Sequence, residues 1–83
     1  MDINVRRKQL KFQAWHRGTK ECDILLGKFA DSFVDDFITS QLDQFAQVLD
    51  QQDVELYAWI TGGILPEHLE TNKVYKSILG YYS

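Results

Sequence analysis

The sequence predicts an all-α fold, a compact bundle of about five helices in a single domain that covers residues 1–83. Apolar residues recur at spacings of three and four along most of the chain, which is the period of an amphipathic helix. No stretch of useful length shows the apolar–polar alternation that is typical of a strand. The 83 residues include one proline and five glycines, so few positions interrupt a helix.

The clearest helical pattern lies in residues 19–37. Its apolar face consists of Cys22, Leu25, Leu26, Phe29, Ala30, Phe33, Val34 and Phe37. We interpret the phenylalanines of this face as core and not as a cofactor site. Gly27 weakens a helix by about 1 kcal/mol relative to alanine, so it either permits close packing of a neighbouring helix or is simply tolerated.

The first helix is predicted at residues 4–16, with Asn4 as the candidate N-cap. Arg6-Arg7-Lys8 oppose the dipole of this helix near its start. Their positions make sense if they meet an acidic partner or the acidic body of the chain, and are tolerable without any function. Trp15 is interpreted as a core or helix-packing anchor rather than a ligand contact.

Residues 40–50 are predicted to form the third helix. Ser40 and Asp43 resemble a capping box with aspartate in place of glutamate. The polar pair Gln51-Gln52 is a short linker, after which Asp53 is expected to cap the fourth helix. Such short connections favour helices packed antiparallel or at steep angles.

The last two helices have recognisable ends. The fourth helix is expected to stop at Gly62-Gly63 and to face the core with Leu56, Tyr57 and Ile60. Pro66 suits the first turn of the last helix, since its missing N–H is no loss there. Asn72 is a poor helix former, so this helix is expected to start late or to bend, and Gly80 is expected to end it.

Charge is distributed unevenly along the chain. The net charge is −3, but residues 1–28 carry +4 and residues 29–72 carry −9. A basic end on an acidic body could steer the approach of a charged partner, or the charges could simply be solvated. Nucleic-acid binding is disfavoured, because an acidic body repels phosphate.

The composition also indicates a compartment. The single cysteine, Cys22, excludes an internal disulfide and fits a reducing environment. No apolar run approaches the ~20 residues of a membrane span, and the N-terminus has no apolar segment of a secretory signal. We therefore expect a cytoplasmic bacterial protein. Cys22 lies on an apolar helix face, which is expected to raise the pKa of its thiol and make it inert.

The stretch Arg17-Gly18-Thr19-Lys20-Glu21 lies between the first two predicted helices. Gly18 is expected to stop the first helix, and Thr19 to cap the second. Glu21 then falls in the first turn, where the dipole favours a negative charge. The stretch is either an ordinary joint with two solvated charges or a docking corner. In the second interpretation Gly18 gives clearance to a partner's backbone, while Arg17 and Glu21 supply directional hydrogen bonds.

These residues resemble a known family. Arg-Gly-x-x-Glu, followed by Asp23 and the run Ile24–Ala30, is similar to the succinate dehydrogenase assembly factor 2 family, and so is Asp-x-x-Leu-x-x-Trp at Asp53–Trp59. The resemblance implies a helical, non-enzymatic assembly factor that promotes covalent attachment of FAD to the flavoprotein subunit of succinate dehydrogenase, with fumarate reductase as a second candidate. It implies that FAD belongs to the partner and is not bound stably by this chain, which is expected to be a monomer.

The resemblance also implies which residues contact the partner: His16, Arg17, Gly18, Glu21, Asp23 and Asp53. Many members of the family carry a basic residue where this chain has His16, and an unperturbed histidine is mostly uncharged at neutral pH. The basic rim of the corner is therefore expected to be weaker here, or displaced to Arg6, Arg7 and Lys8.

No catalytic or metal-binding arrangement stands out. His16 and His68 lie far apart in sequence, and no Cys/His cluster has the spacing of a zinc site. No glycine-rich phosphate loop follows a strand. The residues thus favour a binding protein. Two alternatives remain: an antitoxin-like regulatory partner of a membrane toxin, and a protein that binds FAD directly.

Overall fold

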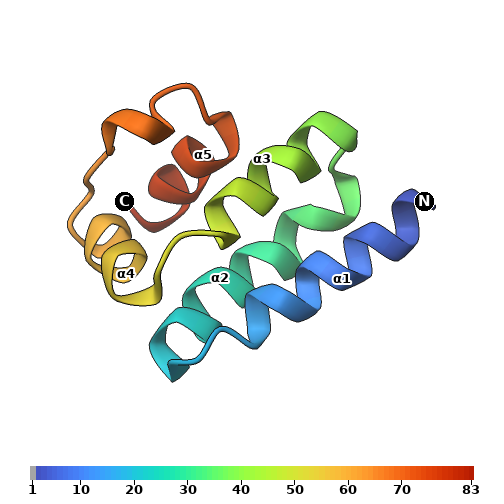
Figure 1. Ribbon diagram of the computed structural model, residues 1–83, viewed down its shortest axis with the longest axis horizontal. Helices are drawn as coiled ribbons and strands as arrows, with labels where there is room; N and C mark the ends of the chain where they lie inside the picture. The colour runs from blue at the N-terminus through green and yellow to red at the C-terminus, as the bar shows by residue number, and fades with distance from the viewer. Residues whose placement is uncertain (1) are drawn as a thin grey trace.

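The computed structural model describes residues 2–83 and contains five α-helices and two short 3-10 helices within them (Figure 1). The α-helices are α1 (Ile3–Trp15), α2 (Lys20–Phe33), α3 (Thr39–Leu49), α4 (Asp53–Thr61) and α5 (Lys73–Tyr82). The 3-10 helices are η1 (Val34–Asp36) and η2 (Glu67–Leu69). No strand occurs in the described range, so the predicted all-α fold of about five helices is confirmed.

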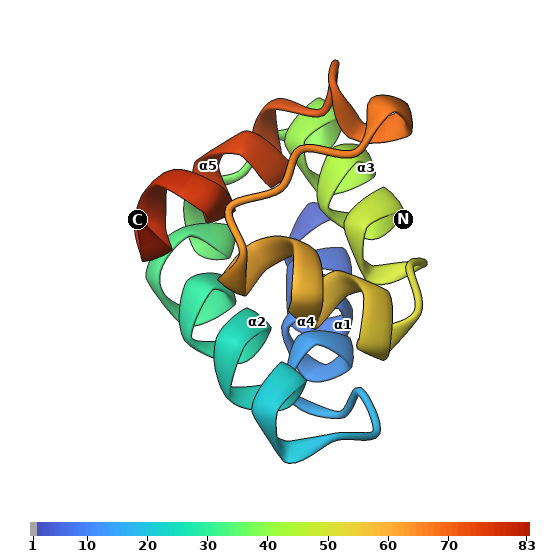
Figure 2. The same ribbon diagram turned by 90° about the vertical axis from the view of Figure 1, so that its left-hand side faces the viewer.

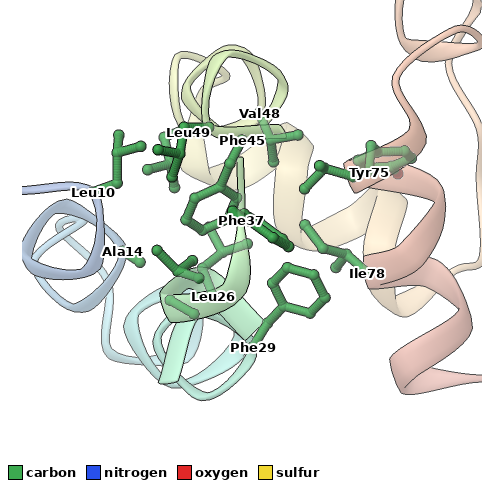
Figure 3. Packing of buried hydrophobic residues seen from close by; sticks show 14 of the residues in the cluster. Leu10, Ala14, Leu26, Phe29, Phe37, Phe45, Val48, Leu49, Tyr75 and Ile78 are labelled. Carbon is green, nitrogen blue, oxygen red and sulfur yellow. The ribbon is translucent and has the colours of Figure 1, made fainter. Parts of the chain in front are cut away.

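Helices α1 and α2 form an antiparallel pair, α3 packs against α1, and α4 packs against α2 (Figure 1). Helix α5 packs mainly against α3 and α4. The core draws side chains from every helix, with Phe29, Phe37 and Phe45 near its centre (Figure 3). The aromatic rings of Phe29 and Phe45 lie 5.9 Å apart, a typical distance for an interacting pair. The phenylalanine stripe is therefore core, although Phe33 at its edge is 41% exposed.

Gly27 allows α1 to approach α2 closely. A Cβ atom at this position would lie under 3.0 Å from three carbon atoms of the Trp15 indole ring. The ring covers the bare backbone, and its Nε1 donates a hydrogen bond to Asp31 Oδ1 at 3.2 Å. The interpretation of Trp15 as a packing anchor is confirmed, and Gly27 permits close packing of a neighbouring helix.

The basic start of α1 meets the acidic body of the chain. Arg6 forms an ion pair of 2.6 Å with Asp43, and Lys11 forms one of 3.3 Å with Asp35. Arg7 donates from Nε and Nη2 to the carbonyl oxygen of Phe37 at 3.1 and 2.7 Å. These contacts are made within the chain, so Arg6 and Arg7 do not supply a free basic rim.

Several predicted helix ends were wrong, two because another local hydrogen bond caps the helix and one because a distant side chain takes the carbonyl of Phe37. Asp2, and not Asn4, caps α1 by accepting from the Asn4 amide at 2.9 Å. Helix α2 ends at Phe33, and Phe37 is extended, with its carbonyl satisfied by Arg7. Ser40 does not open α3, which begins at Thr39; instead the Gln41 side chain accepts from the Ile38 amide at 2.9 Å.

Helix α4 also differs from its prediction in two respects. Asp53 is its first residue and not its cap, since the Asp53 carboxylate bonds to Arg17. Leu56 and Ile60 are buried as expected, but Tyr57 is 41% exposed, so its inward placement was wrong. The expected stop is confirmed: Gly62 ends the helix, and Gly63 follows with φ 67°, a conformation that favours glycine.

The last helix starts late, which is one of the two outcomes expected from the position of Asn72. Pro66 precedes η2 instead of opening α5. Asn72 is 2% exposed and caps α5 by accepting from the Tyr75 amide at 2.8 Å. Gly80 does not end α5, which continues to Tyr82. The Tyr82 hydroxyl donates to the Leu25 carbonyl, a bond to α2 that holds the final turn in place.

Candidate partner-docking site

The turn between α1 and α2 lies at one end of the molecule, below α4 in the view of Figure 2. Gly18 is exposed and has φ 141°, which L side chains rarely adopt. Thr19 caps α2, its hydroxyl accepting from the Cys22 amide at 3.4 Å. Glu21 and Asp23 lie in the first turn of α2, where the helix dipole favours carboxylates. The expected cap and acidic first turn are present. Gly18 does not end α1, because the helix already stops at Trp15 and the His16 amide closes its last turn by donating to the Gln13 carbonyl at 3.2 Å.

Arg17 points into the molecule and joins this turn to the linker between α3 and α4. Its side chain is 9% exposed, and Nε donates to Asp53 Oδ1 at 2.8 Å. The terminal nitrogens donate to the carbonyls of Leu49 and Gln51, the second at 2.5 Å. A guanidinium suits this task because its planar fork serves several acceptors at once. The directional bonds expected of Arg17 are therefore made within the chain.

Two of the predicted carboxylates complete the same network. Asp23 Oδ1 accepts from the Arg17 backbone amide at 2.5 Å, while Asp53 pairs with the Arg17 side chain. The Cys22 thiol donates to the Asp53 carbonyl at 3.4 Å. Asp23 and Asp53 thereby fix the shape of the turn. Sequence reasoning grouped these residues correctly but missed that they bond to one another, because Arg17 and Asp53 are 36 positions apart.

Position 18 requires glycine for two reasons, its φ angle and its close contact with Asp53. A Cβ atom on Gly18 would lie 3.1 Å from Asp53 Oδ2, tighter than most real contacts of a Cβ. A side chain at this position would press on the Arg17–Asp53 pair. The clearance that Gly18 offers to a partner's backbone stays a prediction, separate from this contact within the chain.

His16 and Glu21 lie on the solvent side of the turn. The His16 ring stacks on Phe12 at 4.0 Å, and its Nδ1 donates to the Phe12 carbonyl at 2.8 Å. Glu21 is exposed, and its carboxylate makes no hydrogen bond or ion pair with any residue in the range 2–83. Glu21 is thus the predicted site residue whose polar atoms are most available.

A cavity of about 350 Å³ opens beside the turn, lined by Thr19, Glu21, Asp53, Val54 and Tyr57. Val54 is 80% exposed, the highest exposure among the large apolar side chains of the described residues. Sequence reasoning missed Val54 and placed Tyr57 in the core. The available indication was the position of Val54 directly after Asp53, on the side of α4 away from Leu56 and Ile60.

Cys22 is buried, as expected. Burial raises the pKa of its thiol, and this effect outweighs the hydrogen bond with Thr19 that lowers it. The thiol therefore stays protonated and unreactive at neutral pH. Within residues 2–83, no group of three or more His, Cys, Asp or Glu side chains is arranged to hold a metal ion.

None of the helices in residues 2–83 combines the length and apolar character needed to cross a bilayer. Comparison with known proteins matches residues 8–82 to a family described as the flavinator of succinate dehydrogenase. No solved structure matches the chain.

Curated relatives carry related names. The chain is 39% identical over 71 residues to the FAD assembly factor SdhE of Acetobacter pasteurianus, covering 84% of this chain and 65% of that protein. It is 33% identical over 78 residues to the mitochondrial succinate dehydrogenase assembly factor 2 of Debaryomyces hansenii, covering 89% and 55%. Its counterpart in Schizosaccharomyces pombe is 34% identical over 74 residues, covering 88% and 53%. The chain thus spans between half and two thirds of the length of these relatives.

Proposed function

The chain belongs to the family of flavinators of succinate dehydrogenase, and on that premise we propose that it is an assembly factor for the flavoprotein subunit of this enzyme. It binds the immature subunit through the α1–α2 turn and promotes the covalent attachment of FAD. The observation that carries this proposal is the family match, which extends over residues 8–82. Fumarate reductase, whose flavoprotein is a second candidate partner, falls within the same proposal.

The exposed turn supports a docking role. Gly18, Glu21 and His16 are exposed on one projecting end of the molecule, where a partner can approach without displacing a helix. Arg17, Asp23 and Asp53 hold the turn in place from behind. In this proposal the first three residues contact the partner, and the last three maintain the shape that the partner meets.

The charges of the corner do not suit FAD itself. Glu21, Asp23 and Asp53 place three carboxylates around the turn, against two cations: Arg17, which already has its acceptors, and the exposed Lys20. The pyrophosphate of FAD would be repelled by this arrangement. We therefore propose that the flavin is held by the flavoprotein subunit. That subunit then supplies both the flavin and the residue to which the flavin becomes attached.

The contribution of this chain is then positional. By holding the subunit so that the acceptor histidine lies near the isoalloxazine methyl carbon, it lowers the barrier without donating a catalytic group. Correct orientation of reacting groups can be worth several kcal/mol. This chain acts as a scaffold and not as an enzyme.

The test uses a bacterium deleted for its own member of the family. Expression of the wild-type chain should restore covalent flavin on the flavoprotein subunit, read as in-gel flavin fluorescence. Glu21→Ala should lower this fluorescence while changing the melting temperature of the purified chain little. Glu70→Ala, another exposed carboxylate, lies in the region of η2 away from the turn and serves as the matched control. Normal flavin loading in the deleted strain would refute the proposal.

A further inference from the structure

We propose that the cavity between the start of α2 and α4 receives an apolar side chain of the flavoprotein subunit that has a lysine or arginine beside it. This assignment rests on the proposed function and names the chemistry that the docking site recognises. Three features carry it: an exposed apolar wall, a carboxylate that pairs with no other described residue, and the absence of a side chain at Gly18.

The apolar wall is formed by Val54 and Tyr57 on one face of α4. Val54 is 80% exposed and Tyr57 is 41% exposed, although both lie in a helix whose other face is buried. Valine has low helix propensity and gains nothing from exposure to water. Together they line a hollow of about 350 Å³, within the range of ~300–1,000 Å³ that binding clefts occupy. A hollow of this kind suits a single large apolar side chain.

The charge on the rim of the cavity favours a particular kind of residue beside the partner's apolar side chain. Asp53 also lines the cavity, but its negative charge is offset by Arg17 at 2.8 Å. Among residues 2–83 Glu21 has no such partner, and the adjacent Lys20 forms no ion pair with it because neighbours in a helix do not face each other. The rim therefore has a net negative charge, which is complementary to a lysine or arginine.

Gly18 adds access for a main chain. It is exposed, and it borders Asp53, a residue of the cavity wall. A partner segment can therefore pass over the turn while its apolar side chain enters the hollow. The same rim charge disfavours the pyrophosphate of FAD as the occupant.

The test measures binding of the purified full chain to the FAD-free flavoprotein subunit by titration calorimetry at low and moderate ionic strength. Val54→Ala removes two methyl groups from the wall, and at about 0.8 kcal/mol per buried carbon this predicts roughly tenfold weaker binding with an unchanged salt dependence. Glu21→Gln should weaken binding and flatten its salt dependence, because the charge contact is lost.

Matched controls make the same chemical changes elsewhere. Val5→Ala alters a valine of α1 that is 46% exposed, and Glu70→Gln alters an exposed carboxylate near η2. Both should bind as the wild type does. Circular dichroism of every variant checks that the fold is kept.

Several results would overturn the assignment. If Val54→Ala binds as tightly as Val5→Ala, or if Glu21→Gln keeps the wild-type salt dependence, the cavity is not the recognition site, while the proposed function stands. A wild-type dimer that Val54→Ala dissociates would make a second copy the occupant. Quenching of free FAD by the chain alone, lost in Val54→Ala, would make flavin the occupant. Failure of the wild type to bind the subunit would refute the proposed function and this assignment together.

Discussion

Replacing Arg17 should destabilise the whole chain, even though the sequence places this residue on a surface turn. Arg17→Ala removes a side chain that is 9% exposed and leaves three acceptors unpaired: the Asp53 carboxylate and the carbonyls of Leu49 and Gln51. Breaking a buried pair by removing one partner costs about 3–5 kcal/mol. Asp53 is 18% exposed and keeps some contact with water, so we expect the lower end, about 3 kcal/mol.

This loss is large for a chain of 83 residues. Such a domain has a free energy of unfolding of roughly 4–12 kcal/mol, and each kcal/mol shifts its melting temperature by about 4–8 °C. The expected drop is therefore roughly 12–24 °C. Arg17→Lys keeps the charge but not the planar fork, so it should lose about half as much.

The assay is urea unfolding followed by far-UV circular dichroism, with Lys20→Ala as the control for loss of an exposed cation from the same turn. The control should stay within about 0.5 kcal/mol of wild type. In a double-mutant cycle, Arg17→Ala and Asp53→Ala should be coupled by at least about 1 kcal/mol. If Arg17→Ala costs less than about 1 kcal/mol, the inward network does not hold the turn and the reasoning fails.

Three further predictions concern the core and its edges. Gly27→Ala should lower the melting temperature, since overpacking against Trp15 costs about 1–3 kcal/mol while the gain in helix propensity is about 1 kcal/mol; a rise would contradict the close packing. Asn72→Ala should cost about 2–3 kcal/mol in urea unfolding, because it removes the cap of α5 and the hydrogen bonds of 2.8 and 2.9 Å to α3; a loss below about 0.5 kcal/mol would refute this. The raised pKa of Cys22 favours the neutral thiol in the folded state. The stability that this thiol contributes to folding is therefore fully present below the pKa of the unfolded thiol, and it is lost as pH rises through the folded pKa. Cys22→Ala should therefore show a shallower alkaline loss of stability than wild type, and the raised pKa of Tyr75 should leave part of that loss in both proteins.

The sequence predicts a helix well where an apolar stripe marks the face that the helix buries. The stripe of α2 specifies its core face because each apolar residue has another one three or four positions away. Some helix ends are harder to predict, since bonds from distant segments decide them. Phe37 leaves the helix with its carbonyl bound to Arg7, and α5 continues past Gly80 to Tyr82, which bonds to α2. Neither bond is visible in local propensity.

The candidate site divides in the same way. The cap by Thr19 and the unusual φ of Gly18 depend on adjacent residues, so local rules find them. The pairing of Arg17 with Asp53 needs α4 to be placed beside the turn, which only the complete fold does. The exposure of Val54 has the same origin, because the face that α4 buries is known only once its neighbours are in place.

The inward orientation of the Arg17 side chain affects how tightly a partner can bind to the turn. Because one guanidinium ties the turn to the α3–α4 linker, the surface is preorganised, and a partner does not have to freeze a mobile loop. Loosening that tie would add an ordering cost of about 0.5–1.5 kcal/mol for each side chain that must be immobilised. Substitutions at Arg17 would thus raise the Kd for a partner that never touches its guanidinium.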